Sequence, residues 1–406
     1  MRIAMVSEHA SPLAVLGGPD AGGQNVYVAQ LSRALADRGH TVTVHTRRDA
    51  AGLPARVAFA PGVTVEHVPA GPAGELPKDE LLPYMPAFGR HLARVWAEAP
   101  PDVVHAHFWM SGVAALAGAR GAGVPVVQTF HALGTVKRRH QGARDTSPPE
   151  RVATERRLGR GCDRVLATCG DEVDELAALG VAPSRTSVVP CGVDTGEFSP
   201  RGAPAAVPER TQPYRLLAAG RLVPRKGFDL AVRALADVPG AELLVAGGPG
   251  AARLDGDAEA RRLRALAREY GVADRVRLLG AVGHEAMPAL IRSADLMLAT
   301  PVYEPFGIVP LEAMACGVPV VATAVGGQLD SVADHVTGRL VPPGDRQALA
   351  GAVNALLRSG QTRAAYGAAG RRRALARFSW SRVAEGAEQV YTQVTARHRV
   401  PTGVIR

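Results

Sequence analysis

The sequence predicts an α/β protein with two domains, each built on parallel strands that are joined by helices. The chain has 406 residues, which is more than one ordinary hydrophobic core accommodates. A strand–helix–strand pattern occurs near the start, with strands at residues 2–7 and 41–46, and again at residues 296–322. Such units form parallel crossovers, and their ligands bind at the carboxyl ends of the strands.

Composition and charge are those of a globular protein, so we expect a cytoplasmic protein without a transmembrane segment. The net charge of +9 is carried by scattered basic groups, and no basic strand with interleaved aromatic residues indicates nucleic-acid binding. A homodimer is compatible with this composition. Four cysteines without metal-ligand spacing are expected to be reduced, buried thiols: Cys162, Cys169, Cys191 and Cys316.

Residues 301–317 combine two acids with a predicted helix start. Glu304 lies on the loop, and Glu312 lies just over one turn into the helix that begins at Gly307. The N–H groups at a helix start favour oxygen acceptors and negative charge, and a carboxylate beside them suits the hydroxyls of a sugar or ribose. A helix-start acid and a solvated helix face are the alternative interpretation of the two acids.

Residues 220–227 place Arg221 and Lys226 around a turn at the carboxyl end of a predicted strand. Two cations in this position can hold a diphosphate, although an ordinary solvated basic turn has the same pattern.

The first half carries weaker signals. Gly22 and Gly23 precede a predicted helix and let the backbone approach a ligand, but they are not a G-x-G-x-x-G fingerprint and also fit a tight turn. His131 follows a strand end, where a histidine is more often structural. His105 and His107 have strand spacing without a third metal ligand, so we interpret them as structural or pocket-lining.

Taken together, these motifs resemble the retaining GT-B glycosyltransferases, in the large family that includes sucrose-phosphate synthases and the mycothiol-pathway N-acetylglucosaminyltransferase. The resemblance is carried by residues 20–28, 129–137, 188–200 and 220–227, and above all by Glu-Pro-Phe-Gly at 304–307 with the following Ala-Met-Ala-Cys-Gly. It implies two Rossmann-like domains facing each other across a cleft, with a C-terminal helix that crosses back. The expected domains are residues 1–198, completed by 379–406 and serving the acceptor, and residues 214–378, serving the nucleotide sugar.

The resemblance also implies roles for individual residues. The catalytic group would be His131, Arg221, Lys226 and Glu304, with Glu304 on the donor sugar and Glu312 on the ribose. Donor binding would further involve Gly22, Gly23, Pro305, Phe306, Gly307, Ile308 and Val309. Acceptor binding would involve Gln24, Asn25, Lys78, Phe108 and Arg151. Phe108 and Ala132 stand where the mycothiol enzyme has Tyr and Thr, so the acceptor match is partial.

We therefore expect transfer of a hexose or N-acetylhexosamine from a nucleotide diphosphate sugar to a hydroxyl of a small acceptor, and the sequence leaves open whether that acceptor is phosphorylated. UDP-glucose or UDP-N-acetylglucosamine is the favoured donor, with no cofactor or metal required and Mg²⁺ not essential. No carboxylate is a convincing nucleophile, so same-face attack is expected. The alternatives are a GDP-mannose-dependent mannosyltransferase, a nucleotide-sugar epimerase, a non-catalytic sensor and a transferase acting on a lipid acceptor.

Overall fold

The chain folds into two compact units, and the computed structural model describes residues 1–14, 22–202, 205–305 and 307–399. The first unit comprises Met1–Pro190 and Trp380–Arg406, and the second comprises Cys191–Ser379. Each is a parallel sheet with helices, so the expected α/β class with two Rossmann-like sheets is confirmed.

The first unit has an eight-stranded sheet in the order β3-β4-β2-β1-β5-β6-β7-β8. All neighbours are parallel except the antiparallel pair β3 and β4 at one edge. The strands are β1 (Arg2–Val6), β2 (Thr41–Arg47), β3 (Arg56–Ala60), β4 (Val63–Val68), β5 (Val103–His107), β6 (Val126–Thr129), β7 (Arg164–Ala167) and β8 (Thr186–Val188).

Its helices cover the sheet, and the central strands are buried on both faces, as parallel strands usually are. The core includes Val104, Val126 and Val165 from the strands and Met85 and Trp96 from one helix. The helices are α1 (Gly23–Asp37), α2 (Met85–Glu98), α3 (Trp109–Ala119), α4 (Gly134–Gln141), α5 (Arg151–Gly161), α6 (Gly170–Ala178) and α14 (Trp380–Arg399), with short 3₁₀ turns η1 (Lys78–Glu80), η2 (Leu82–Tyr84), η3 (Gly142–Arg144) and η4 (Pro183–Arg185).

The second unit has a six-stranded, all-parallel sheet in the order β11-β10-β9-β12-β13-β14. The strands are β9 (Tyr214–Ala219), β10 (Ala241–Ala246), β11 (Val276–Gly280), β12 (Leu296–Ala299), β13 (Val320–Thr323) and β14 (Gly338–Val341). The helices are α7 (Phe228–Leu235), α8 (Ala258–Glu269), α9 (Met287–Arg292), α10 (Ile308–Ala315), α11 (Gly327–Ser331), α12 (Arg346–Arg358) and α13 (Gly360–Arg373), with 3₁₀ turns η5 (Pro224–Lys226), η6 (Ala251–Gly256) and η7 (His284–Ala286) and the π-helical segment η8 (Ala374–Phe378).

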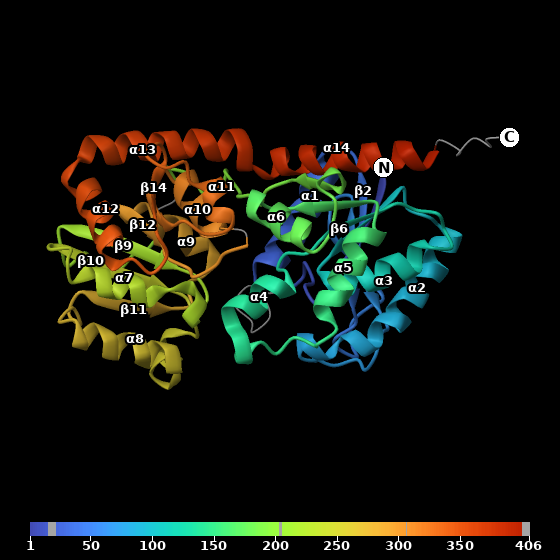
Figure 1. Ribbon diagram of the computed structural model, residues 1–406, viewed down its shortest axis with the longest axis horizontal. Coiled ribbons are helices and arrows are strands. Elements are labelled where there is room, and N and C mark those ends of the chain that lie inside the picture. Colours follow the sequence, from blue (N-terminus) through green and yellow to red (C-terminus); the bar gives the residue numbers. More distant parts are fainter. Residues whose placement is uncertain (15–21, 203–204, 306, 400–406) are drawn as a thin grey trace. The chain divides into compact units, whose positions relative to one another are not determined.

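The final helix belongs to the first unit although it follows the second in sequence. Figure 1 shows α14, in red, running along α1, and the two helices pack together. The ring of buried Trp380 packs edge-to-face on that of Tyr27 on α1, with ring centroids 5.6 Å apart. The first unit is therefore built from both ends of the chain.

The boundary between the units lies before Cys191, whereas the sequence analysis assigned residues up to 198 to the first domain. The segment after Pro190 is bonded to the second unit. The Val193 N–H donates to the carbonyl of Phe378, and the Arg371 guanidinium donates to the carbonyls of Thr195 and Phe198. These partners lie far along the chain, so composition could not place the boundary.

Three local features of the fold bear on the sequence-based predictions. Asp257 is the N-cap of α8 and accepts from the Ala260 N–H at 2.8 Å, and Asp255 forms an ion pair with Arg264 at 2.8 Å. The four cysteines are free and buried, as expected. No strand was expected between residues 47 and 102, where β3 and β4 lie.

Candidate functional site

The strand order of the second unit reverses between β9 and β12. From β9 the chain proceeds outward through β10 to β11, and from β12 it proceeds in the other direction through β13 to β14. In open parallel sheets, ligands bind outside the carboxyl ends of the strands at such a switch point. The two loops that leave β9 and β12 here carry Arg221, Lys226 and Glu304.

These two loops are tied together through their backbones. The Thr300 hydroxyl donates to the carbonyl of Gly227 at 2.8 Å, and the Val302 N–H donates to the carbonyl of Arg225 at 2.9 Å. Gly227 has φ 65°, and a Cβ there would lie 1.9 Å from the Thr300 oxygen. A glycine is required for this approach, since other residues would clash. The basic loop is thus held beside the loop of Glu304.

Glu304 is a buried carboxylate surrounded by cations. Lys226 forms a short ion pair with it, and Nη1 of Arg225 lies 4.0 Å from the same oxygen. Burial alone would raise the pKa of Glu304, but Lys226, Arg225 and Arg221 outweigh that effect and hold it below its usual value. Burial lowers the pKa of Lys226, which Glu304 partly restores. The result is an ionised carboxylate in a site with excess positive charge.

The helix α10 begins beside this cluster. Gly307 is its N-cap in the left-handed conformation, with φ 70°. The first turn of a helix has N–H groups without intrahelical partners, and here these belong to Ile308 and its neighbours. Pro310 is accommodated at the start because its missing N–H would have no partner there. Phe306, another predicted donor contact, lies outside the described residues.

Glu312 is half-buried on α10, and its electrostatics differ from those of Glu304. Burial, and secondarily the charge of Glu197, raises the pKa of Glu312 to about 8, although Lys226 opposes this. One carboxyl of this unit is therefore held ionised and the other neutral at pH 7. Paired acids with pKa values displaced in opposite directions are common at functional sites.

The first unit has its own switch point, between β1 and β5. Phe108 follows β5 with φ 79°, and His131 follows shortly after β6 with φ 63°. Positive φ is unusual for residues other than glycine and often marks functional sites. The described chain has only one other such residue, His335.

Two predicted acceptor cations converge on Phe108. Nζ of Lys78 lies 5.7 Å from the centre of the Phe108 ring, and Cζ of Arg151 lies 5.1 Å from it. Arg151 is buried and forms an ion pair with Glu155 at 2.7 Å. A cation over an aromatic ring is attracted to its face, so Lys78 and Arg151 both contact the Phe108 ring.

Gln24 and Asn25 bind neighbouring loops through their side chains. The Gln24 amide donates to the Ser7 hydroxyl at 3.3 Å and to the carbonyl of His107 at 3.4 Å. Asn25 accepts from the Gly22 N–H at 3.0 Å and donates to the carbonyl of Ser11 at 3.0 Å. Both side chains therefore shape the start of α1.

Among the described residues, no group of three or more metal-ligating side chains is placed to hold a metal ion. In the same part of the chain, no helix is long and apolar enough to cross a bilayer.

Comparison with known proteins agrees with this geometry. The family model described as "Glycosyltransferase Family 4" matches residues 21–197, and that described as "Glycosyl transferases group 1" matches residues 203–373. The D-inositol 3-phosphate glycosyltransferase of Acidothermus cellulolyticus is 39% identical over 98% of this chain and 91% of its own length. That of Xylanimonas cellulosilytica is 40% identical over 98% and 97%. The sucrose-phosphate synthase of Thermosynechococcus elongatus has a TM-score of 0.86 and 33% identity, over 98% of this chain and 99% of its own.

The chain is a GT-B glycosyltransferase. The predicted family is confirmed, and with it the transferase activity. HepE of Anabaena, solved in complex with UDP, has the same fold, with a TM-score of 0.74 and 20% identity over 97% of this chain and all of its own.

The structure of this glycosyltransferase adds residues that the sequence analysis missed in the second unit. Arg225 lies beside Glu304, and its guanidinium is 5.5 Å from the ring centre of Tyr303. The run Pro-Arg-Lys before Gly227 was the available signal. Gly326 has φ 47°, and a Cβ there would lie 2.3 Å from the carbonyl oxygen of Glu304, which accepts from the Gly327 N–H at 2.9 Å. The glycine pair thus fixes the backbone of Glu304.

The first unit of the glycosyltransferase also has a missed pair directly after β1. Nδ1 of His9 lies 2.7 Å from the buried carboxylate of Glu8, and the Ser111 hydroxyl donates to the other oxygen of Glu8. The His9 ring lies edge-on to Phe108 at 4.9 Å. His9 therefore joins Lys78 and Arg151 around the same ring, and its position immediately after a strand was the signal.

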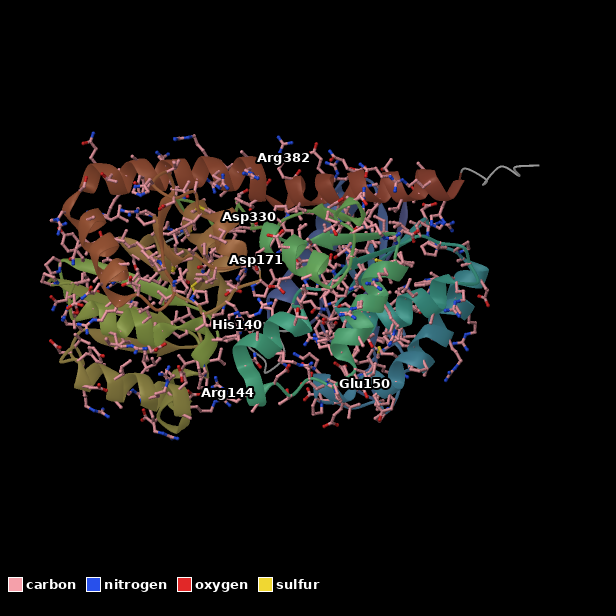
Figure 2. All side chains as sticks on the ribbon, viewed as in Figure 1. His140, Arg144, Glu150, Asp171, Asp330 and Arg382 are labelled. Atoms are coloured by element: carbon pink, nitrogen blue, oxygen red, sulfur yellow. The ribbon has the colours of Figure 1, made fainter. Side chains whose placement is uncertain are left out.

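Basic side chains elsewhere on the first unit are dispersed on the surface. Arg138, Arg139, His140 and Arg144 are exposed on α4 and η3. Figure 2 shows His140 and Arg144 of this segment, with the acidic Glu150 further along the chain. Arg139 forms an ion pair with Glu175 at 2.6 Å, and Lys137 forms one with Asp145 at 3.0 Å. Opposite charges are thus interspersed with the basic ones.

Proposed function

We propose that this glycosyltransferase moves a hexose or N-acetylhexosamine from UDP-glucose or UDP-N-acetylglucosamine to a hydroxyl of a small phosphorylated acceptor, with retention of anomeric configuration. The observation that carries the proposal is the buried Lys226–Glu304 ion pair at the switch point of the second unit, beside Arg225 and the start of α10. The second unit would bind the nucleotide sugar, and the first would bind the acceptor.

The donor assignment rests on charge. Breaking the bond between the anomeric carbon and the diphosphate builds negative charge on the leaving group. Arg221, Lys226 and the N–H groups of α10 are preorganised to stabilise it. Glu304 would accept hydrogen bonds from sugar hydroxyls, since its low pKa keeps it ionised, and Glu312 would bind the ribose.

The acceptor assignment rests on Lys78 and Arg151, whose charges lie close to one ring. A phosphate is a small anion that lysine and arginine side chains both bind well. The related enzymes named for D-inositol 3-phosphate make that compound the first acceptor to test. Gln24, Asn25 and His9 would complete this side, and His131, with Gly22 and Gly23, would contact the donor.

The mechanism we propose is same-face substitution. The bond from the anomeric carbon to the diphosphate oxygen breaks, the acceptor oxygen forms the new bond on the same face, and its proton passes to a diphosphate oxygen. A double displacement would need a free carboxylate nucleophile, and Glu304 is instead neutralised by Lys226. Trapping of a glycosyl-enzyme intermediate would contradict this mechanism.

The first experiment is thermal unfolding with UDP, GDP, ADP and dTDP, in the wild type and in Glu312→Ala. A ligand at a hundredfold excess over its Kd adds about 2.7 kcal/mol to stability. We expect UDP to raise the Tm of the wild type and to do so less in the variant. If only GDP raises the Tm, the proposed donor becomes a GDP-sugar instead of a UDP-sugar. If none of the four nucleotides raises the Tm, the proposed donor site is contradicted.

Product formation then separates a transferase from an epimerase or a sensor. UDP-glucose and UDP-N-acetylglucosamine are each incubated with D-inositol 3-phosphate, and with inositol as the matched acceptor that lacks phosphate. We expect UDP release that depends on the phosphorylated acceptor, with a glycoside of retained configuration. An epimerised donor, or no turnover, would contradict the proposal.

A further inference from the structure

His131 has a backbone conformation that its surroundings must enforce. Its φ of 63° lies in the left-handed region, and its side chain is 4% exposed. Residues other than glycine in such conformations cost on the order of 1–3 kcal/mol and persist only where contacts over-determine them. We therefore expect the side chains that contact the His131 ring to hold this residue in place.

His107 makes a polar contact to that ring. Its Nδ1 lies 3.0 Å from Nε2 of His131, and the two rings are stacked with centroids 5.2 Å apart at 22°. The ring of Tyr27, from α1, meets His131 edge-on at 5.1 Å. The hydrogen bond fixes the rotation of the ring, whereas the aromatic contact only confines it.

His107 is itself held rigidly. Its ring lies 4.0 Å from that of His105, which is bonded through Nε2 to the Thr129 hydroxyl at 2.9 Å and through Nδ1 to the Tyr391 hydroxyl at 2.7 Å. His105 and His107 are fully buried. The support of His131 thus extends through β5 to α14.

Burial favours the neutral form of all three imidazoles. Burial lowers the pKa of His105 to about 3, and burial with the neighbouring imidazoles lowers the pKa values of His107 and His131 well below normal. A neutral imidazole has one N–H and one lone pair. In a bond between two of them, one nitrogen must donate and the other accept, so the tautomer of His107 fixes that of His131.

We propose that His107 is a positioning residue that sets the ring orientation and tautomer of His131 through the Nδ1–Nε2 hydrogen bond. The inference rests on the proposed function, in which His131 contacts the donor sugar. His107 acts on turnover only through His131, and the pair is a unit rather than two independent buried histidines.

The test is a pair of isosteric substitutions. The amide of His107→Asn lies near the position of Nδ1 and can keep the bond to His131, whereas the amide of His107→Gln lies near Nε2 and cannot. We expect His107→Gln to lower kcat roughly 10- to 100-fold, as misplaced catalytic groups do, with the Kd for UDP within about twofold of the wild type. His107→Asn should regain most of kcat. Transfer from the UDP-sugar that the wild type uses to D-inositol 3-phosphate is measured.

Two controls separate positioning from general stability. His45→Asn alters another buried histidine of the same sheet, on β2, and should leave kcat unchanged. In a double-mutant cycle, His107→Gln should cost little further in a His131→Ala background, because its effect passes through His131. Additive losses, or equal kcat values in His107→Asn and His107→Gln, would overturn the proposal.

A measurement that does not depend on catalysis distinguishes the positioning role of His107 from the proposed glycosyltransferase function. In protein labelled with ¹⁵N-histidine, the ring ¹⁵N shifts of His131 should change in His107→Gln and not in His45→Asn. Unchanged shifts in His107→Gln would overturn the positioning role. An inactive wild type with the expected shift changes would contradict the proposed function and leave the His107–His131 bond established.

Discussion

The strand ends of the two units have opposite polar chemistry. In the second unit, charged groups dominate, with an ionised Glu304 among Lys226 and Arg225. In the first, the side chains that contact His131 are the aromatic rings of His107 and Tyr27, which favour an uncharged site. The charged site lies on two neighbouring loops, whereas the neutral site is assembled from β5, β6, α1 and α14. Charge suits the stabilisation of a departing diphosphate, and neutral imidazoles suit the orientation of a sugar by hydrogen bonds.

The largest effect is expected from removing charge in the second unit. Lys226→Met should lower kcat by roughly 10²–10³-fold, because it deletes a cation that faces the departing diphosphate and leaves Glu304 buried with less compensation. Steady-state transfer measures this. Arg253→Met, which removes an exposed cation of η6, is the matched control. Comparable losses in both variants would show that general charge matters rather than this site.

A second prediction concerns Glu312, whose pKa is raised to about 8. The unfolded chain releases this proton near pH 4.3, while the folded chain keeps it until about pH 8. Between these values the unfolded state binds fewer protons, so wild-type stability from this group falls as pH rises. Glu312→Gln removes the effect.

The Tm of Glu312→Gln minus that of the wild type should therefore grow from pH 5 to pH 8.5, by roughly 5 °C. Thermal unfolding across this range measures it, and Glu197→Gln, which removes the carboxylate acting on Glu312, should give a smaller change of the same sign. A Tm difference between Glu312→Gln and the wild type that is constant with pH would contradict the raised pKa of Glu312.

A smaller loss is expected from the neutral site. Tyr391→Phe removes the hydroxyl bonded to buried His105 and should cost about 1–3 kcal/mol of stability. The Tm shift produced by UDP should remain unchanged, because nucleotide binding is assigned to the second unit. Thr392→Ala, at an exposed position of the same helix, is the control. A reduced UDP shift in Tyr391→Phe would break the division of roles between the units.

The smallest effect concerns Phe108. Phe108→Tyr adds a hydroxyl to the ring shared by Lys78 and Arg151 and should lower the KM for D-inositol 3-phosphate by roughly two- to fivefold, the gain of a single hydrogen bond. Phe59→Tyr alters another ring beneath a guanidinium, that of Arg33 at 4.4 Å, and should leave this KM unchanged. An unchanged KM in Phe108→Tyr would contradict an acceptor that lies against this ring.

The second unit was more predictable from sequence than the first because its site consists of short motifs. Arg221, Lys226 and Glu304 lie on the loops that follow β9 and β12, in short motifs that the sequence shows directly, and their roles remain predictions. Arg225 was missed, since a third basic residue in a turn is indistinguishable from a solvated one until its partner Glu304 is seen.

In the first unit, the missed features depend on distant partners. No prediction covered residues 63–68, where β4 buries the carboxylate of Glu66 against His91 at 2.8 Å and Arg56 at 2.7 Å. His105 and His107 were interpreted as structural or pocket-lining, but Tyr391, which fixes His105, lies 286 residues away. The periodicity of apolar residues along the sequence reflects local secondary structure. It carries no information on contacts between residues that lie far apart in the chain.

The insertion of the second unit between the two parts of the first has a consequence for biosynthesis. A ribosome releases the second unit before α14, so Tyr27 and His105 emerge long before Trp380 and Tyr391 can reach them. The first sheet must remain incompletely covered while some 190 residues of Cys191–Ser379 are made and fold. The domain whose synthesis begins first is therefore completed last. The contact between His105 and Tyr391 can form only when α14 has left the ribosome.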